Sequence, residues 1–281
     1  MVIDFHTHIF PPEIRSRRSE FFEGEPEFRL LYESQKSRMA GAREIVAAMD
    51  EQEVDQSVVF GFPWKDANIC RRHNDYIMEA VSRHPRRLIG FGCMDPFHPD
   101  AADEAARCLA AGLSGIGELA LYGNGFDQEA LRRLAPLMAA AGERRRPILI
   151  HTNEPVGHQY PGKAPMTLGQ IDELVKRFAN NTLVLAHWGG GLFFYHLLKK
   201  EIKAHLENVY FDTAASPFLY DPGIYAAAAG IIGAEKILFG SDFPLIKPRR
   251  YFNEMASAGL SEDEMAAICG GNAAALLAPG R

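Results

Sequence analysis

Eight short apolar segments, separated by stretches of helical periodicity, constrain the fold of this 281-residue chain more than any other feature. After the first unit they recur about every 25–36 residues, which is the scale of a strand followed by a helix. Their continuous hydrophobicity is typical of parallel strands that are covered on both faces. The pattern predicts a (β/α)8 TIM barrel, with a doubly wound open sheet as the alternative. The expected strands begin at residues 3, 58, 88, 115, 148, 183, 209 and 237.

The chain shows no composition shift or linker, so we expect a single domain over residues 1–281. The segment of about 11–41 begins with Pro11-Pro12 and is rich in charged residues and phenylalanine. We expect it to be an insertion after the first strand that packs locally through its phenylalanines. This insertion could be a lid or the interface of a homodimer. Pro136, in an otherwise helical stretch, predicts either two short helices or a kink.

Composition excludes several classes of function. The formal net charge of −6 argues against nucleic acid or an anionic membrane surface as a partner. No apolar run approaches the ~20 residues that span a bilayer, and no signal-peptide pattern precedes the first strand. The four cysteines form no CxxC pair, as expected of reduced thiols. We therefore expect a cytoplasmic protein with reduced cysteines that acts on a small molecule.

Polar residues that can bind metals stand at the ends of five predicted strands. His6 and His8 close the first strand and, being two residues apart, point to the same side. The carboxyl ends of all strands of a barrel open on one face, so these side chains should ring one mouth. Taken singly, each could be a barrel-end histidine bound to a carbonyl or an aspartate that caps a helix. Besides His6 and His8, the metal-competent residues at strand ends are Glu118, His151, His187 and Asp242.

Several of these positions fall in motifs of a known family. The segments 4–8 (DFHTH), 186–190 (AHWGG), 239–244 (FGSDFP) and 271–277 (GNAAALL) resemble the amidohydrolase-related (amidohydrolase 2) branch of the amidohydrolase superfamily. The resemblance covers essentially the whole chain. This branch contains metal-dependent hydrolases and nonoxidative decarboxylases, including relatives of aminocarboxymuconate semialdehyde decarboxylase.

The resemblance implies roles for the strand-end residues. His6, His8, His151 and Asp242 would bind the principal metal; zinc is the expected ion, with manganese or another divalent ion as alternatives. Asp242 and His187 would be catalytic, moving protons or stabilising developing charge. Glu118 could bind a second metal, as a glutamate does in TatD-like hydrolases, or orient a ligand histidine.

The motifs define the site better than the reaction, because the hydrolase and decarboxylase mechanisms would use the same ligands. Glu118 favours a metal-dependent hydrolase of a small organic, carboxylate-bearing substrate. The alternative is a metal-dependent decarboxylase of a small aromatic or unsaturated acid. A TatD-like nuclease or a non-catalytic metal-binding module is disfavoured. Loops after the strands suggest aromatic and cationic substrate contacts at Trp64, Tyr122, Asn153, Trp188 and Lys247.

Overall fold

The computed structural model describes residues 1–199 and 202–278, and its eight parallel strands follow one another in the order β1 to β8. Backbone hydrogen bonds from Phe5 N to Phe239 O (2.7 Å) and from Asp242 N to His6 O (2.9 Å) join β8 to β1. These bonds close the sheet into a barrel, so the predicted TIM barrel is confirmed. The strands are β1 Ile3–His8, β2 Gln56–Phe60, β3 Leu88–Gly92, β4 Gly115–Leu119, β5 Ile148–Ile150, β6 Leu183–Leu185, β7 Val209–Asp212 and β8 Ile237–Leu238.

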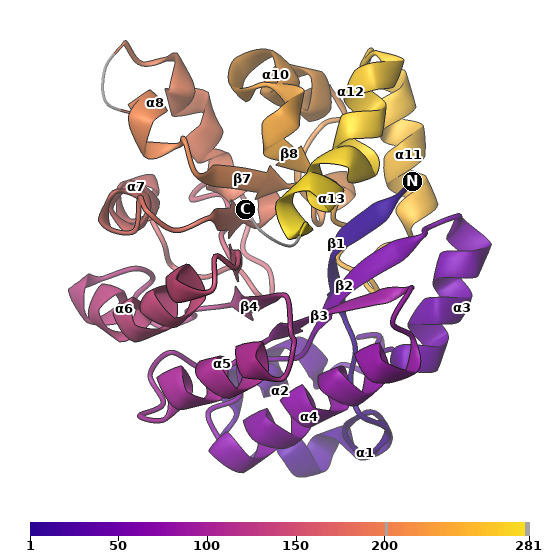
Figure 1. Cartoon of the computed structure of the whole chain (residues 1–281), viewed down its shortest axis with the longest axis vertical. Coiled ribbons are helices and arrows are strands. Elements are labelled where there is room, and N and C mark those ends of the chain that lie inside the picture. Colours follow the sequence, from indigo (N-terminus) through magenta and orange to yellow (C-terminus); the bar gives the residue numbers. More distant parts are fainter. Residues whose placement is uncertain (200–201, 279–281) are drawn as a thin grey trace.

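Helices surround the strands, as Figure 1 shows. The α-helices are α1 Pro12–Ser16, α2 Pro26–Tyr32, α3 Ala42–Gln52, α4 Ala67–Arg83, α5 Ala101–Ala110, α6 Gln128–Glu143, α7 Leu168–Arg177, α8 Ile202–His205, α9 Ser216–Leu219, α10 Gly223–Ile232, α11 Pro248–Ser257, α12 Glu262–Ala266 and α13 Asn272–Leu277. Three 3-10 helices and one π-helical turn complete the described secondary structure: η1 Arg18–Phe21, η2 His187–Leu197, η3 Ala234–Lys236 and η4 Ala267–Gly271.

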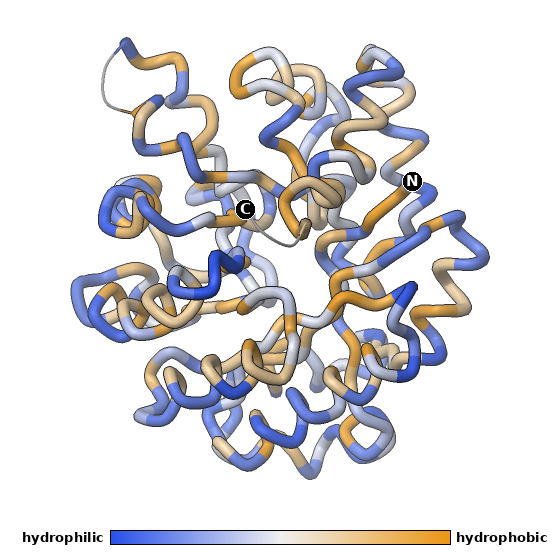
Figure 2. The backbone as a smooth tube through the Cα atoms, viewed as in Figure 1, coloured by the Kyte–Doolittle hydropathy of each residue, from blue (hydrophilic) through white to orange (hydrophobic). Residues whose placement is uncertain are grey.

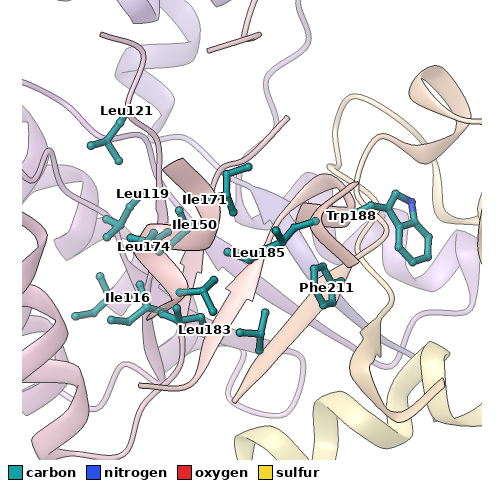
Figure 3. Close-up of a cluster of buried hydrophobic side chains, with 14 of the residues drawn as sticks. Ile116, Leu119, Leu121, Ile150, Ile171, Leu174, Leu183, Leu185, Trp188 and Phe211 are labelled. Atoms are coloured by element: carbon teal, nitrogen blue, oxygen red, sulfur yellow. The ribbon is translucent and has the colours of Figure 1, made fainter. Parts of the chain in front are cut away.

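Apolar side chains fill both sides of the barrel wall. Outward-facing residues of β4 to β7 pack under the helices, and Figure 3 shows Ile150 and Leu185 beside Ile171 and Leu174 of α7. A second cluster takes one or more buried residues from each of six strands and fills the interior; its members include Phe5, Val58, Phe60, Phe91, Cys93, Leu149, Val184 and Leu238. Helix α13 packs against this cluster and covers the end of the barrel where the strands begin. Helix α13 does not cover the opposite end of the barrel, where the strands finish and where functional sites of such barrels lie.

Local sequence signals account for several helix boundaries. Side-chain capping boxes formed by Thr167 with Gln170 and by Ser261 with Glu264 begin α7 and α12. Of the two alternatives predicted at Pro136, two short helices or a kink, the first is not found, since α6 runs continuously from Gln128 to Glu143 with Pro136 inside it. Pro136 lies on the exposed face of α6, where water can satisfy the carbonyl group that loses its helical partner.

The segment between β1 and α3 forms α1, η1 and α2 and packs on aromatic rings. Phe28 of α2 is fully buried, and its ring lies 4.4 Å from that of Trp64 and 5.8 Å from that of Phe22, between centroids. Arg18 Nη1 donates hydrogen bonds to three carbonyl oxygens, that of Tyr32 at the end of α2 and those of Ser34 and Ser37 just after it. Aromatic packing and this arginine together fix the conformation of the segment.

Polarity is distributed as in a globular barrel. In Figure 2 the hydrophilic stretches of the surrounding helices gather on their outer sides, while the strands are largely apolar. Within residues 1–199 and 202–278, no helix combines the length and the apolarity needed to cross a membrane.

We predict that Phe28→Ala lowers the free energy of unfolding by about 3–5 kcal/mol, since it removes a fully buried ring and leaves a cavity. Denaturant unfolding followed by circular dichroism measures this change. Phe97→Ala is the control, because this ring is 45% exposed and its loss should change stability by no more than about 0.5 kcal/mol. A loss below about 1 kcal/mol for Phe28→Ala would show that the insertion is not anchored by this ring.

Candidate metal centre and its cavity

A buried histidine from β1 presents an unpartnered nitrogen to the mouth of the barrel. His6 Nδ1 lies 2.8 Å from Asp212 Oδ2 at the end of β7, and both side chains are fully buried. Because the carboxylate accepts, Nδ1 carries a hydrogen, and Nε2 is the ring nitrogen that faces the site. Nε2 itself is buried and has no hydrogen-bond partner. A buried polar atom without a partner is costly, and a metal ion would satisfy it.

Four donor atoms lie at the mutual distances expected around one ion. His6 Nε2 is 3.6 Å from Glu118 Oε2 and 3.8 Å from Asp242 Oδ1. His8 Nε2 is 3.7 Å from Glu118 Oε2 and 3.3 Å from Asp242 Oδ1. Ligands held at ~2.1 Å from a tetrahedral ion are separated by about 3.4 Å. The donor set of two imidazoles and two carboxylates therefore fits a divalent metal.

The electrostatics of the cluster also favour a cation. In the described part of the chain, all ion pairs of Glu118, Asp212 and Asp242 are with histidines. Burial is the largest effect on His6 and lowers its pKa, but Glu118 and Asp212 outweigh it and raise the pKa to about 10. For Asp242 burial is also the largest effect and raises its pKa, but the neighbouring histidines, His8 first, bring the pKa down to about 2. Burial acts in the same direction on Glu118, but the histidines hold the pKa of Glu118 well below its ordinary value, so Glu118 and Asp242 are ionised and a divalent ion would relieve their repulsion.

His187 directs one ring nitrogen into the cavity. Its Nδ1 donates to the carbonyl oxygen of Ala214 (2.9 Å), and its Nε2 lies 3.6 Å from Glu118 Oε1. Burial opposes protonation most strongly, but the hydrogen bond to Glu118 and the charge of Asp242 raise the pKa of His187 above its ordinary value. His187 can therefore hold a proton on the nitrogen that faces the site.

His151 is engaged differently from the other histidines. Its Nδ1 lies 2.9 Å from Glu118 Oε1, and its Nε2 lies 3.0 Å from the carbonyl oxygen of Gly162. Both partners accept hydrogen bonds, so a neutral ring satisfies only one of these contacts. To bind a metal, His151 would have to give up one of the two.

Left-handed backbone conformations aim two of the site residues. His187 has a φ of 53° and Asp242 a φ of 58°, values that cost non-glycine residues about 1–3 kcal/mol each. Hydrogen bonds hold both: His187 N donates to Asp212 Oδ1, and Asp242 N donates to the carbonyl oxygen of His6. Gly190 is required nearby, because a Cβ there would lie 2.4 Å from the carbonyl oxygen of Asn153.

His8, Glu118 and Asp242 line the floor of a cavity of about 850 Å³, a volume typical of pockets for small organic molecules, and His6 is buried behind them. Aromatic rings provide much of its wall, with Phe62 after β2, Tyr122 after β4 and Phe218 of α9. Residues after α2 and in the loop that follows β5 complete the wall and the rim. The cavity thus joins a charged, metal-competent floor to an aromatic wall.

Of the five predicted substrate contacts, only Tyr122 lines this cavity. Trp64 is fully buried in the aromatic cluster of the insertion, and its Nε1 donates to His73 Nδ1 (2.9 Å). Trp188 is also fully buried, and its Nε1 donates to Ser216 Oγ (2.6 Å). Both rings belong to the hydrophobic core, and the prediction that they contact substrate is wrong.

The two polar candidates also lie outside the cavity. Asn153 is buried and fixes the loop after β5 by exchanging hydrogen bonds with the backbone of Ala164. Lys247 is exposed and pairs with Glu51 of α3 at 2.9 Å. Both residues follow a strand and so lie toward the end of the barrel that holds the cavity. Their side chains do not line the cavity.

Two parts of the site were missed from the sequence. Asp212 closes β7, so the rule that selected the other strand ends could also have selected it. The stretch 30–38 lines the cavity, and no sequence signal places it there, because its position depends on how the insertion folds.

We predict that Asp212→Asn lowers the affinity for a divalent metal by about 10–100-fold, because the charged partner that orients His6 is lost. Titration of metal-free protein with Mn²⁺ or Zn²⁺ measures the change. Asp103→Asn, at an exposed position in α5, removes the same charge away from the site and should leave affinity unchanged. Equal affinities for the two variants would rule out the orienting role of Asp212.

A family model described as amidohydrolase matches residues 3–278 of the chain. The gamma-resorcylate decarboxylase of Rhodococcus jostii (strain RHA1) is 25% identical over 256 residues, which cover 74% of this chain and 76% of that protein. The crystal structure of 5-carboxyvanillate decarboxylase from Sphingomonas paucimobilis has a TM-score of 0.76 at 18% identity and covers 98% of both chains.

A dihydroxybenzoic acid decarboxylase from Polaromonas sp. JS666, with bound manganese and the inhibitor 2-nitroresorcinol, has a TM-score of 0.70. It is 19% identical, and the match covers 98% of this chain and 96% of that one. At such identities the likeness to solved structures shows the fold. All three relatives are named as decarboxylases, which contradicts the predicted hydrolase and agrees with the alternative. The prediction failed because both reactions use the same metal ligands, so the motifs do not separate them.

Proposed function

We propose, from the premise that this chain belongs to the amidohydrolase family, that it is a metal-dependent, nonoxidative decarboxylase of a small hydroxylated aromatic acid. The observation that carries the proposal is the convergence of donor atoms from His6, His8, Glu118 and Asp242, of which His6 and Glu118 are buried, beside an aromatic-walled cavity. The named decarboxylation of aromatic acids by the similar proteins supports the reaction type.

His6, His8, Glu118 and Asp242 would hold the divalent ion, with His151 joining them if it releases Glu118 or Gly162. When bound, the ion supplies a Lewis acid that draws the oxygens of an anionic substrate to the floor. Manganese in one similar structure supports a divalent ion of this kind, and zinc remains compatible with the donors. Asp212 would keep His6 oriented toward the ion.

The protein side chains would then manage one proton. Breaking the bond between the ring and its carboxylate leaves the electron pair on the ring carbon and releases carbon dioxide. His187, protonated at Nε2, would donate the proton that forms the new C–H bond. Glu118 and Asp242 favour the protonated form of His187 before transfer. The rings of Phe62 and Tyr122 would hold the substrate ring over the floor.

The test of the reaction is carbon dioxide release from 2,6-dihydroxybenzoate and related hydroxybenzoates by metal-loaded protein. In D₂O we expect a single deuterium to replace the lost carboxylate on the ring carbon, and NMR of the product shows this. Lactones, esters, amides and phosphoesters serve as the comparison panel. Turnover of that panel without carbon dioxide release from any aromatic acid would overturn the proposal.

We predict that His187→Gln lowers kcat by about 10²–10⁴-fold, because the proton donor is lost while the metal donors remain. Metal content, measured in parallel by elemental analysis, should stay that of the parent. The matched control is His84→Gln, since His84 follows α4 and lies outside the cavity. Unchanged kcat in His187→Gln would remove His187 from the mechanism.

We further predict that chelation abolishes activity and that one equivalent of Mn²⁺ or Zn²⁺ per chain restores it. The same ion should raise the melting temperature, because it binds the folded site and relieves the repulsion between the buried Glu118 and the partly buried Asp242. Differential scanning calorimetry with and without metal measures the shift. Full activity in metal-free protein would contradict the proposed site.

A further inference from the structure

Two cations from the insertion stand at the rim of the cavity. Lys36 and Arg38 line it, and both are exposed, whereas the donors of the floor are buried or nearly so. In residues 1–199 and 202–278 no other lysine or arginine lines this cavity. No ion pair or side-chain hydrogen bond engages either cation within that part of the chain.

The backbone that carries these cations is held in place. Arg18 Nη1 lies 3.3, 3.2 and 3.0 Å from the carbonyl oxygens of Tyr32, Ser34 and Ser37. Ser37 Oγ donates a further hydrogen bond of 2.7 Å to the carbonyl oxygen of Leu31. Arg18 thus stabilises the backbone of this segment, while Lys36 and Arg38 line the cavity with their charged groups available to a ligand.

Charge is arranged in the cavity along its depth. The acidic side chains among its described lining residues are Glu118 and Asp242, both on the floor. Aromatic and aliphatic side chains such as Phe62, Tyr122 and Phe218 line the wall between floor and rim. Within the described residues, the ion pairs of both carboxylates are with histidines and not with Lys36 or Arg38, so a ligand can supply a carboxylate to the two rim cations.

We propose that Lys36 and Arg38 bind a second carboxylate of the substrate, so that the preferred substrate is an aromatic diacid. This inference rests on the proposed function for the first carboxylate, which would lie at the floor. The ring would lie along the aromatic wall, and the second carboxylate would face the rim. The planar guanidinium of Arg38 can pair with both oxygens of a carboxylate, and the ammonium of Lys36 adds a second charge.

Binding of unreactive acids tests the inference without relying on turnover. The probes are benzoate and the 1,3- and 1,4-benzenedicarboxylates, titrated calorimetrically into the metal-loaded protein. We expect one dicarboxylate to bind at least about tenfold more tightly than benzoate. The double variant Lys36→Ala/Arg38→Ala should lose this advantage and bind benzoate as the parent does.

Two further variants separate direct contact from general attraction. Arg43→Ala removes an exposed arginine of α3 that lies outside the cavity, and it should keep the dicarboxylate advantage. Lys36→Arg/Arg38→Lys keeps both charges and should retain most of it. If the double alanine variant weakens benzoate and dicarboxylate equally, the cations only attract anions, and the inference is wrong.

The remaining outcomes distinguish this inference from the proposed function. Equal binding of benzoate and both dicarboxylates by the parent would overturn the inference, even if hydroxybenzoates release carbon dioxide. A dicarboxylate advantage that depends on Lys36 and Arg38 would support it, even if no aromatic acid is decarboxylated; the proposed function alone would then fail.

Discussion

The contact between His6 and Asp212 is the interaction on which the site depends. It joins the ends of β1 and β7, fixes the tautomer of His6 and directs Nε2 into the mouth of the barrel. The other oxygen of Asp212 holds the backbone of His187, which adopts a left-handed conformation. One buried carboxylate therefore positions both a metal donor and the proposed proton donor. This arrangement requires a closed barrel, because β7 and β1 are far apart in an open sheet and come close only when β8 pairs with β1.

The cavity combines two parts of different origin. Its floor is made by strand ends, which a rigid barrel holds at fixed separations. Its rim is made largely by an insertion that packs through Phe28 and is held by Arg18. The floor thus suits a reaction at a metal, whereas the rim can set which acid enters. The predicted insertion could have been a lid or an interface, and the structure places its residues 30–38 on the cavity wall.

The distinction between hydrolysis and decarboxylation does not lie in the metal donors. A hydrolase needs an activated water and a base, and a decarboxylase needs a proton donor over the substrate ring. The same histidine and carboxylate residues serve either purpose. Similarity to decarboxylases of aromatic acids, together with an aromatic cavity wall, favours decarboxylation over the expected hydrolysis. Glu118, which had favoured hydrolysis, lies at 2.9 Å from His151 and close to His6 and His8, a position compatible with either reaction.

The sequence by itself determined the barrel and the residues at its mouth. Spaced apolar segments specify strands, and strand ends such as His6, His8 and Asp242 converge in any parallel barrel. It did not reveal that α6 continues through Pro136, because that depends on which face of the helix meets water. Nor did it separate Tyr122, which lines the cavity, from Trp64 and Trp188, which are core residues. Only the tertiary structure decided these points, because burial and side-chain direction depend on neighbours far away in the chain.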